Sequence, residues 1–66
     1  MVNIQLNGER TETNCQTLFE LVQSLQLENK RFAVEQNERI VPKSKLIDTP
    51  LSEDDRIEII QAVGGG

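Results

Sequence analysis

The chain has 66 residues, a net charge of −4 and a hydrophobic fraction of 36%, which predicts one folded domain with a thin core. Its 7 basic residues form no cluster large enough to indicate nucleic-acid binding, and no apolar stretch approaches the roughly 20 residues of a membrane span. With no histidine and 1 cysteine, the chain lacks a usual zinc site, an internal disulfide and a Cys–His or Ser–His pair, so we expect no metal, no catalytic residues and no permanently bound cofactor.

The first segment is predicted to form a β-hairpin. Apolar residues occupy every second position, the period of a half-buried strand: Val2, Ile4 and Leu6. Asn7 and Gly8 then supply the two φ > 0 positions of a type I′ turn. The return strand, about residues 10–14, is mostly polar, which is typical of an exposed or edge strand.

A helix is predicted over residues 18–26. Thr17 and Glu20 match a capping box, in which the threonine accepts a hydrogen bond from the third helical N–H and the glutamate reaches back to the cap. Four apolar residues then share one helical face: Leu18, Leu21, Val22 and Leu25. No other segment is available to cover the first face of the sheet, so we expect this stripe in the core.

Two strands connected by a turn are predicted after the helix. Phe32 and Val34 begin the first of them, and residues 36–38 form the turn. The return strand at residues 40–41 stops at Pro42, which lacks the N–H that a strand ladder requires.

The last strand is predicted at residues 57–62. An irregular connection over residues 43–50 precedes it, with two apolar residues expected to pack over the edge of the core: Leu46 and Ile47. Residues 52–55 read as an acidic turn. The whole order predicts an α+β fold, a mixed sheet of four or five strands with one helix packed on one face and the last strand central, parallel to the first.

The end of the sequence predicts a domain over residues 1–63 and a flexible glycine tail over residues 64–66. Three extended residues reach roughly 10 Å at about 3.3–3.6 Å each, enough to carry a carboxylate through a narrow slot. A frayed terminus without function is the alternative interpretation.

The alternation of the last strand predicts a surface for a partner. If Ile57 and Ile59 point into the core, Ile60 and Ala62 point to the opposite sheet face. We expect these two residues, with Ala33 nearby, to contact a partner. The alternative is that one exposed isoleucine is ordinary on a protein surface.

Charged residues near the last strand leave two interpretations open. These residues are acidic: Glu53, Asp54, Asp55 and Glu58. Either they steer the chain towards a basic groove on a partner, or they only form a solvated turn. Three basic residues close in sequence are expected on a solvated face: Arg39, Lys43 and Lys45. We expect Cys15 to behave as a small buried apolar residue rather than a redox group. A single cysteine and the lack of a signal-peptide pattern favour the cytoplasm.

Several stretches together resemble the ubiquitin-like β-grasp family and, within it, the ThiS-type sulfur carriers of thiamine biosynthesis. The more specific among them are Ile40-Val41-Pro42-Lys43 and the terminal glycines. The sequence departs from the family at Gln36, where an apolar residue is usual, and at Asp54, where glycine is usual.

The resemblance implies a carrier and co-substrate rather than an enzyme. An E1-like activating enzyme would use ATP and Mg to adenylate the Gly66 carboxylate, which is otherwise ionised and a poor electrophile. Sulfur from a persulfide donor, a cysteine desulfurase or a rhodanese-like protein, would displace AMP and leave a thiocarboxylate. A thiazole synthase would then take the sulfur, and Gly64 and Gly65 would provide clearance for the tail.

Three other functions remain open beside this one. The small subunit of molybdopterin synthase uses the same tail chemistry in a chain that tends to be longer. A ubiquitin-like protein modifier ends in an isopeptide bond. A non-covalent binding module would have a glycine tail without a role.

Overall fold

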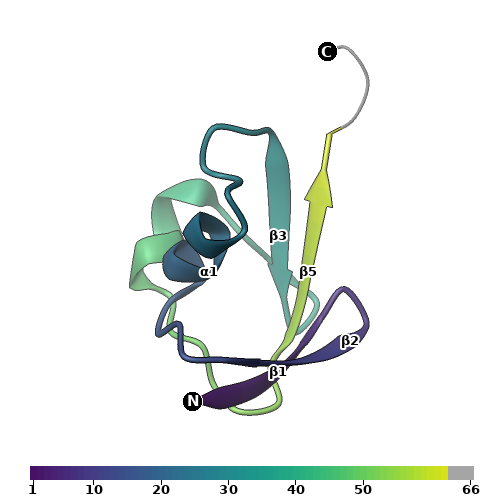
Figure 1. Cartoon of the computed structure of the whole chain (residues 1–66). Helices are drawn as coiled ribbons and strands as arrows, with labels where there is room; N and C mark the ends of the chain where they lie inside the picture. The colour runs from purple at the N-terminus through teal and green to yellow at the C-terminus, as the bar shows by residue number, and fades with distance from the viewer. Residues whose placement is uncertain (63–66) are drawn as a thin grey trace.

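The computed structural model describes residues 1–62 (Figure 1). The predicted end of the domain at residue 63 and the predicted glycine tail at residues 64–66 therefore lie outside the described residues. The described part contains these elements: β1 (Val2–Leu6), β2 (Glu9–Thr13), α1 (Leu18–Ser24), β3 (Phe32–Gln36), β4 (Arg39–Val41), the 3₁₀ helix η1 (Lys43–Asp48) and β5 (Arg56–Gln61).

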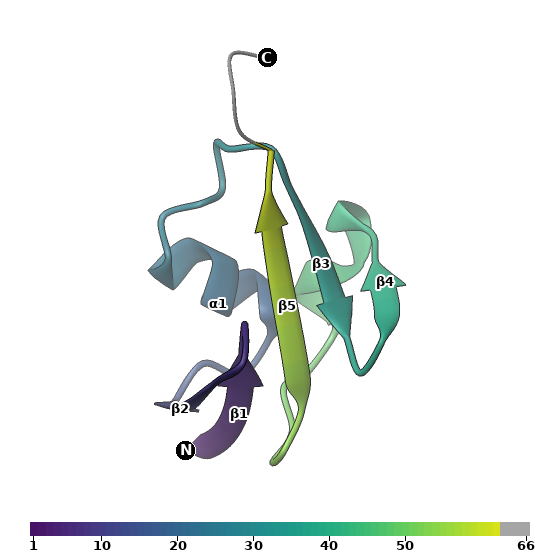
Figure 2. The same ribbon diagram turned by 90° about the vertical axis from the view of Figure 1, so that its right-hand side faces the viewer.

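The strands form one mixed sheet in the order β2-β1-β5-β3-β4. β5 lies in the centre and runs parallel to β1, whereas the other neighbours are antiparallel. Figures 1 and 2 show α1 and η1 on the same side of this sheet. The predicted α+β architecture, with a central last strand and one face covered, is confirmed.

Both hairpins turn through left-handed backbone. Asn7 (φ 51°) and Gly8 (φ 85°) connect β1 to β2, and Asn37 (φ 52°) and Glu38 (φ 71°) connect β3 to β4. Two consecutive positive φ values match the type I′ turn, whose twist suits the flanking strands. The predicted turn signals are thus confirmed, with Gln36 still part of β3.

The two turn asparagines also bind the central strand. The Asn7 Oδ1 accepts a hydrogen bond from the Ile59 N–H at 2.8 Å. The Asn37 Oδ1 accepts one from the Arg56 N–H at 2.9 Å. Each hairpin is therefore connected to β5 by a side chain as well as by its strand ladder.

The helix begins as predicted but ends earlier. The Thr17 Oγ1 accepts a hydrogen bond from the Glu20 N–H at 3.2 Å, as predicted. The Glu20 Oε1 accepts one at 2.8 Å from the N–H of Gln16, the residue before the cap, and not from the cap itself. The helix ends at Ser24, and Gln26 takes a left-handed φ of 60°.

This early end overturns the predicted burial of Leu25, which is 41% exposed. As the residue that follows the last helical turn, Leu25 no longer lies on the apolar stripe. Leu27 is buried in the core instead, after the chain changes direction.

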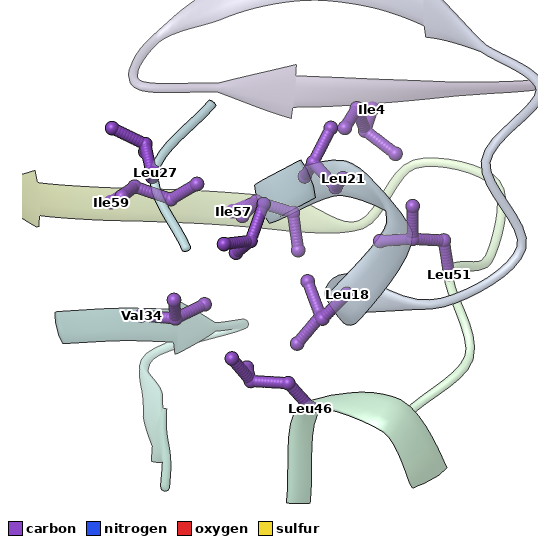
Figure 3. Packing of buried hydrophobic residues seen from close by; sticks show 10 residues of the cluster. Ile4, Leu18, Leu21, Leu27, Val34, Leu46, Leu51, Ile57 and Ile59 are labelled. Carbon is purple, nitrogen blue, oxygen red and sulfur yellow. The ribbon is translucent and has the colours of Figure 1, made fainter. Parts of the chain in front are cut away.

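The core lies between the sheet and the layer formed by α1 and η1 (Figure 3). Ten buried apolar residues form it: Ile4, Leu18, Leu21, Val22, Leu27, Val34, Leu46, Leu51, Ile57 and Ile59. The connection predicted to be irregular contains η1, which buries Leu46 but leaves Ile47 60% exposed. The predicted packing of Ile47 is wrong because successive residues of a 3₁₀ helix point about a third of a turn apart.

Candidate functional site

The predicted partner residues gather near the end of β5. Ile60 and Ala33 are cross-strand partners, and both are exposed, Ile60 by 56%. Ala62 follows β5 directly, is exposed, and donates its N–H to the Arg31 carbonyl at 3.0 Å. Figure 2 shows β5 leading towards this point, beyond which Gly64, Gly65 and Gly66 lie outside the described residues.

The alternation that predicted this exposure is confirmed. Ile57 and Ile59 are buried, at 0% and 8% exposure, on the face that α1 covers. Ile60 is exposed on the opposite face of the sheet. Side chains alternate along a strand, so the apolar run Ile57–Ile60 splits between the two faces. Exposure of Ile60 is a fact of the fold, while its contact with a partner remains a prediction.

Sequence reasoning missed the exposure of Ile40. It is 74% exposed and pairs with Glu35, which in turn pairs with Glu58. Its neighbour Val41 pairs with the buried Val34 and packs against the core. Period-two alternation on β4 was the available signal, because a Val41 side chain that faces the core requires Ile40 to face outwards.

The acidic turn before β5 is not uniformly solvated, because Asp55 is buried at 8% exposure. Its Oδ2 accepts hydrogen bonds from the Gln36 Nε2 at 3.0 Å and the Ser52 N–H at 2.8 Å, and its Oδ1 accepts one from the Asn37 Nδ2 at 3.0 Å. Asp55 therefore connects the β3–β4 hairpin to the start of β5. Neither of the two predicted roles, electrostatic steering of the chain or a place in a solvated turn, fits Asp55. Its partner Gln36 is the residue that is polar where the family usually has an apolar one.

Glu53 and Asp54 are exposed in the same turn. The Glu53 carboxylate accepts hydrogen bonds from the backbone N–H of Asn3 at 3.0 Å and from the Asn3 side-chain amide at 3.1 Å. These two bonds, the backbone one above all, hold the pKa of the Glu53 carboxyl below its usual value. Arg10 lies 3.2 Å from Asp54 and 3.9 Å from Glu53. Asp54, where the family usually has glycine, adopts a φ of 68°. This acidic turn precedes β5, so it lies at the opposite end of that strand from Ala62.

Within residues 1–62 no group of three or more potential ligand side chains is placed to hold a metal ion. In the same range no helix has the length and apolar character that crossing a bilayer demands. Cys15 is half-buried and packs against the core, as expected of a small apolar residue.

Comparison with known proteins identifies the family. The profile of the ThiS family matches residues 3–66. The chain belongs to the ThiS family. The sulfur carrier protein ThiS of Bacillus subtilis (strain 168) is 40% identical to it over 65 residues, which cover 96% of this chain and 98% of that protein.

Two further relatives extend this result. A ThiS structure, the thiamine biosynthesis protein of Geobacter metallireducens, superposes with a TM-score of 0.81 over 98% of this chain and 100% of that one, at 22% identity. It confirms the ThiS β-grasp fold. The thiazole synthase of Paramagnetospirillum magneticum is 33% identical over 66 residues, which are 98% of this chain but 20% of that protein.

Proposed function

We propose that this chain is a sulfur carrier of thiamine biosynthesis that carries sulfur on the carboxylate of Gly66. The observation that carries the proposal is the near full-length similarity to a protein named sulfur carrier protein ThiS. The family match favours the thiamine route over the small subunit of molybdopterin synthase. A segment similar to this chain in proteins named thiazole synthase supports such a synthase as the partner that takes the sulfur.

The proposed chemistry begins with activation of the carboxylate. At neutral pH a terminal carboxyl, with a pKa of about 3.3–3.7, is ionised and has no leaving group. In an E1-like enzyme, with ATP and Mg²⁺, a carboxylate oxygen of Gly66 attacks the α-phosphorus and pyrophosphate leaves. The product is an acyl adenylate, whose AMP is a good leaving group.

Sulfur transfer then follows in two steps. The terminal sulfur of a persulfide on the donor protein attacks the Gly66 carbonyl carbon and AMP leaves, which gives an acyl disulfide. A thiol cleaves the S–S bond, forms a disulfide with the donor cysteine and releases the thiocarboxylate. The chain itself contributes no acid, base or metal to these steps, so in this proposal it is a co-substrate of its partners.

The geometry of the fold supports contact between the partner and the end of β5. Gly66 is the fourth residue after Ala62, and four steps of about 3.3–3.6 Å each reach at most about 14 Å. An enzyme whose reactive groups meet Gly66 must therefore approach β5 closely. The exposed residues Ile60 and Ala33 lie where such an enzyme would make contact.

Tail variants test this function in a reconstituted reaction with the cognate activating enzyme, ATP and a persulfide donor. One residue added after Gly66 is expected to abolish thiocarboxylate formation, because the carboxylate is displaced from the reactive groups. Gly65→Val is expected to reduce it strongly, since a β-branched side chain restricts the backbone and fills the clearance. Full activity of both variants, with melting temperatures like that of the wild type, would refute the carrier function.

A further inference from the structure

Basic residues meet where β5 ends. The loop between α1 and β3 brings Lys30 and Arg31 to this point, and the Arg31 carbonyl accepts the Ala62 N–H at 3.0 Å. Figure 2 shows this loop arriving at the end of β5. Both basic residues are exposed. They therefore flank the last described residue of the chain, next to the start of the tail.

Lys43, from the start of η1, joins them through two contacts. Its Nζ donates to the Lys30 carbonyl at 3.3 Å and lies 4.6 Å from the centroid of the Phe32 ring. Phe32 pairs with Gln61, the last residue of β5. A cation over an aromatic face is held by the negative face of the ring. We call Lys30, Arg31 and Lys43 the basic collar.

The basic collar is not neutralised by the part of the chain that the structure covers. Both ion pairs found among residues 1–62 involve Arg10, in the hairpin that packs against the acidic turn at the far end of β5. Glu28, in the same loop as Lys30, forms no ion pair there. The whole chain has 11 acidic and 7 basic residues, and the collar takes three of the basic ones. The other end of β5 carries the exposed acidic residues Glu53 and Asp54 together with the basic residues Arg10, Arg39 and Arg56. The tail end of β5 therefore carries a basic cluster that forms no ion pair among residues 1–62.

If the tail enters a partner in extended form, Gly66 is carried too far from the basic collar for the collar to act on the reacting group. An extended tail places the carboxylate up to about 14 Å beyond Ala62. Charges in physiological salt are largely screened beyond a Debye length of about 8 Å. The collar therefore acts on the protein surface that lies against the base of the tail, rather than on the carboxylate or on a nucleotide bound there.

We propose that the basic collar docks against an acidic surface of the thiazole synthase, next to the point where that enzyme takes up the tail. The proposal rests on the proposed function, in which that enzyme takes the sulfur from Gly66. The similarity of this chain to a segment of proteins named thiazole synthase selects the synthase as the partner. A chain of net charge −4 is repelled by an acidic surface except at the basic collar, so the collar turns the carrier tail-first and raises the association rate.

Charge reversal tests the proposal on the full-length chain. Arg31→Glu and Lys43→Glu, alone and combined, are compared with Arg56→Glu, which makes the same change of charge as each single variant, at an exposed position at the start of β5. Arg39→Glu combined with Arg56→Glu is the control for the combined variant, because both residues are exposed. Association with the cognate thiazole synthase is followed by stopped flow at several salt concentrations. The combined collar variant is expected to lower the association rate about 10-fold or more at low salt, and to flatten its salt dependence. Arg56→Glu is expected to change neither by more than about twofold, because its charge lies away from the contact.

Two further variants separate charge from folding. Lys43→Arg is expected to retain the wild-type rate, because it keeps the cation over Phe32. Lys43→Gln, which removes the charge without introducing an acid, is expected to give an association rate between those of the wild type and Lys43→Glu. Circular dichroism confirms that each variant is folded before its rate is compared.

Three results would overturn the proposal: equal association rates for collar and Arg56 variants, an unchanged salt dependence, or a loss of affinity confined to the activating enzyme. The proposed function is measured separately, as sulfur on Gly66 of the wild-type chain. If the wild type accepts sulfur and the collar variants bind the synthase normally, only the docking proposal fails. If the wild type accepts no sulfur, the carrier function fails.

Discussion

Replacing Asp55 by alanine is expected to destabilise the domain substantially, although the sequence places this residue in an acidic turn. The carboxylate is buried and accepts three hydrogen bonds, from Gln36, Asn37 and Ser52. A hydrogen bond to a charged group contributes about 1.5–3 kcal/mol, so a simple sum would reach about 4.5–9 kcal/mol. The donors lie near the surface and regain water after the substitution, which reduces the expected loss to about 2–4 kcal/mol.

That loss is large for a chain of this size. At roughly 0.05–0.15 kcal/mol per residue, a 66-residue domain is stable by only about 3–10 kcal/mol. A loss of 2 kcal/mol or more should lower the melting temperature by at least about 8 °C. Far-UV circular dichroism in heat and in urea measures it, since the chain has no Trp or Tyr for fluorescence.

The matched control is Asp48→Ala, which removes an exposed carboxylate from η1 and should change stability by less than about 0.5 kcal/mol. A double-mutant cycle with Gln36→Leu adds a second test. Because Gln36 donates to Asp55, the leucine should cost less in the Asp55→Ala background than in the wild type. Additive effects, or an Asp55→Ala variant as stable as Asp48→Ala, would refute the view that this carboxylate holds the hairpin to β5.

Three further predictions concern the core, the acidic turn and the outer sheet face. Leu21→Ala should cost about 2–5 kcal/mol because the side chain is 3% exposed, while Gln23→Ala should cost little; equal melting temperatures would mean that the wrong helix face has been assigned to the core. Glu53→Gln should destabilise the chain at neutral pH and not in strong acid, because a carboxyl whose pKa is lowered by folding contributes stability that is lost as the pH falls; a pH-independent difference in urea midpoint would contradict this. Ile60→Asp should weaken binding to the activating enzyme with little change in melting temperature, whereas Ile47→Asp, also exposed, should not; equal affinities for the two variants would place the contact elsewhere.

Local signals in the sequence account for much of the fold. The two asparagine-led turns require positive φ, and both hairpins lie where Asn7 and Asn37 predict them. The Thr17 cap starts the helix as predicted. The alternation of β5 correctly assigns Ile57 and Ile59 to the core.

The errors concern the end of the helix and side chains whose surroundings come from other parts of the chain. The helix stripe includes Leu25 only if the helix continues beyond Ser24, which it does not. Burial of Asp55 requires amides from the β3–β4 hairpin, so no pattern within the turn itself could reveal it. The burial of Ile47 depended on the path of a connection that no periodicity defined.

The candidate site divides in the same way. Exposure of Ile60 and Ala33 follows from alternation and is confirmed, while their role in partner binding stays a prediction. The basic collar was not predicted from the sequence, because Lys43 was grouped with its sequence neighbours Arg39 and Lys45. The fold instead places Lys43 against the carbonyl of Lys30.

The mass of the chain after sulfur transfer tests the central claim most directly. The wild-type chain and a Cys15→Ser variant are incubated with the cognate activating enzyme, ATP, Mg²⁺ and a persulfide donor, and fragment masses locate the change. The carrier function predicts an ATP-dependent exchange of one oxygen for one sulfur on Gly66 in both proteins. Sulfur found on Cys15, or no exchange in either protein, would contradict it.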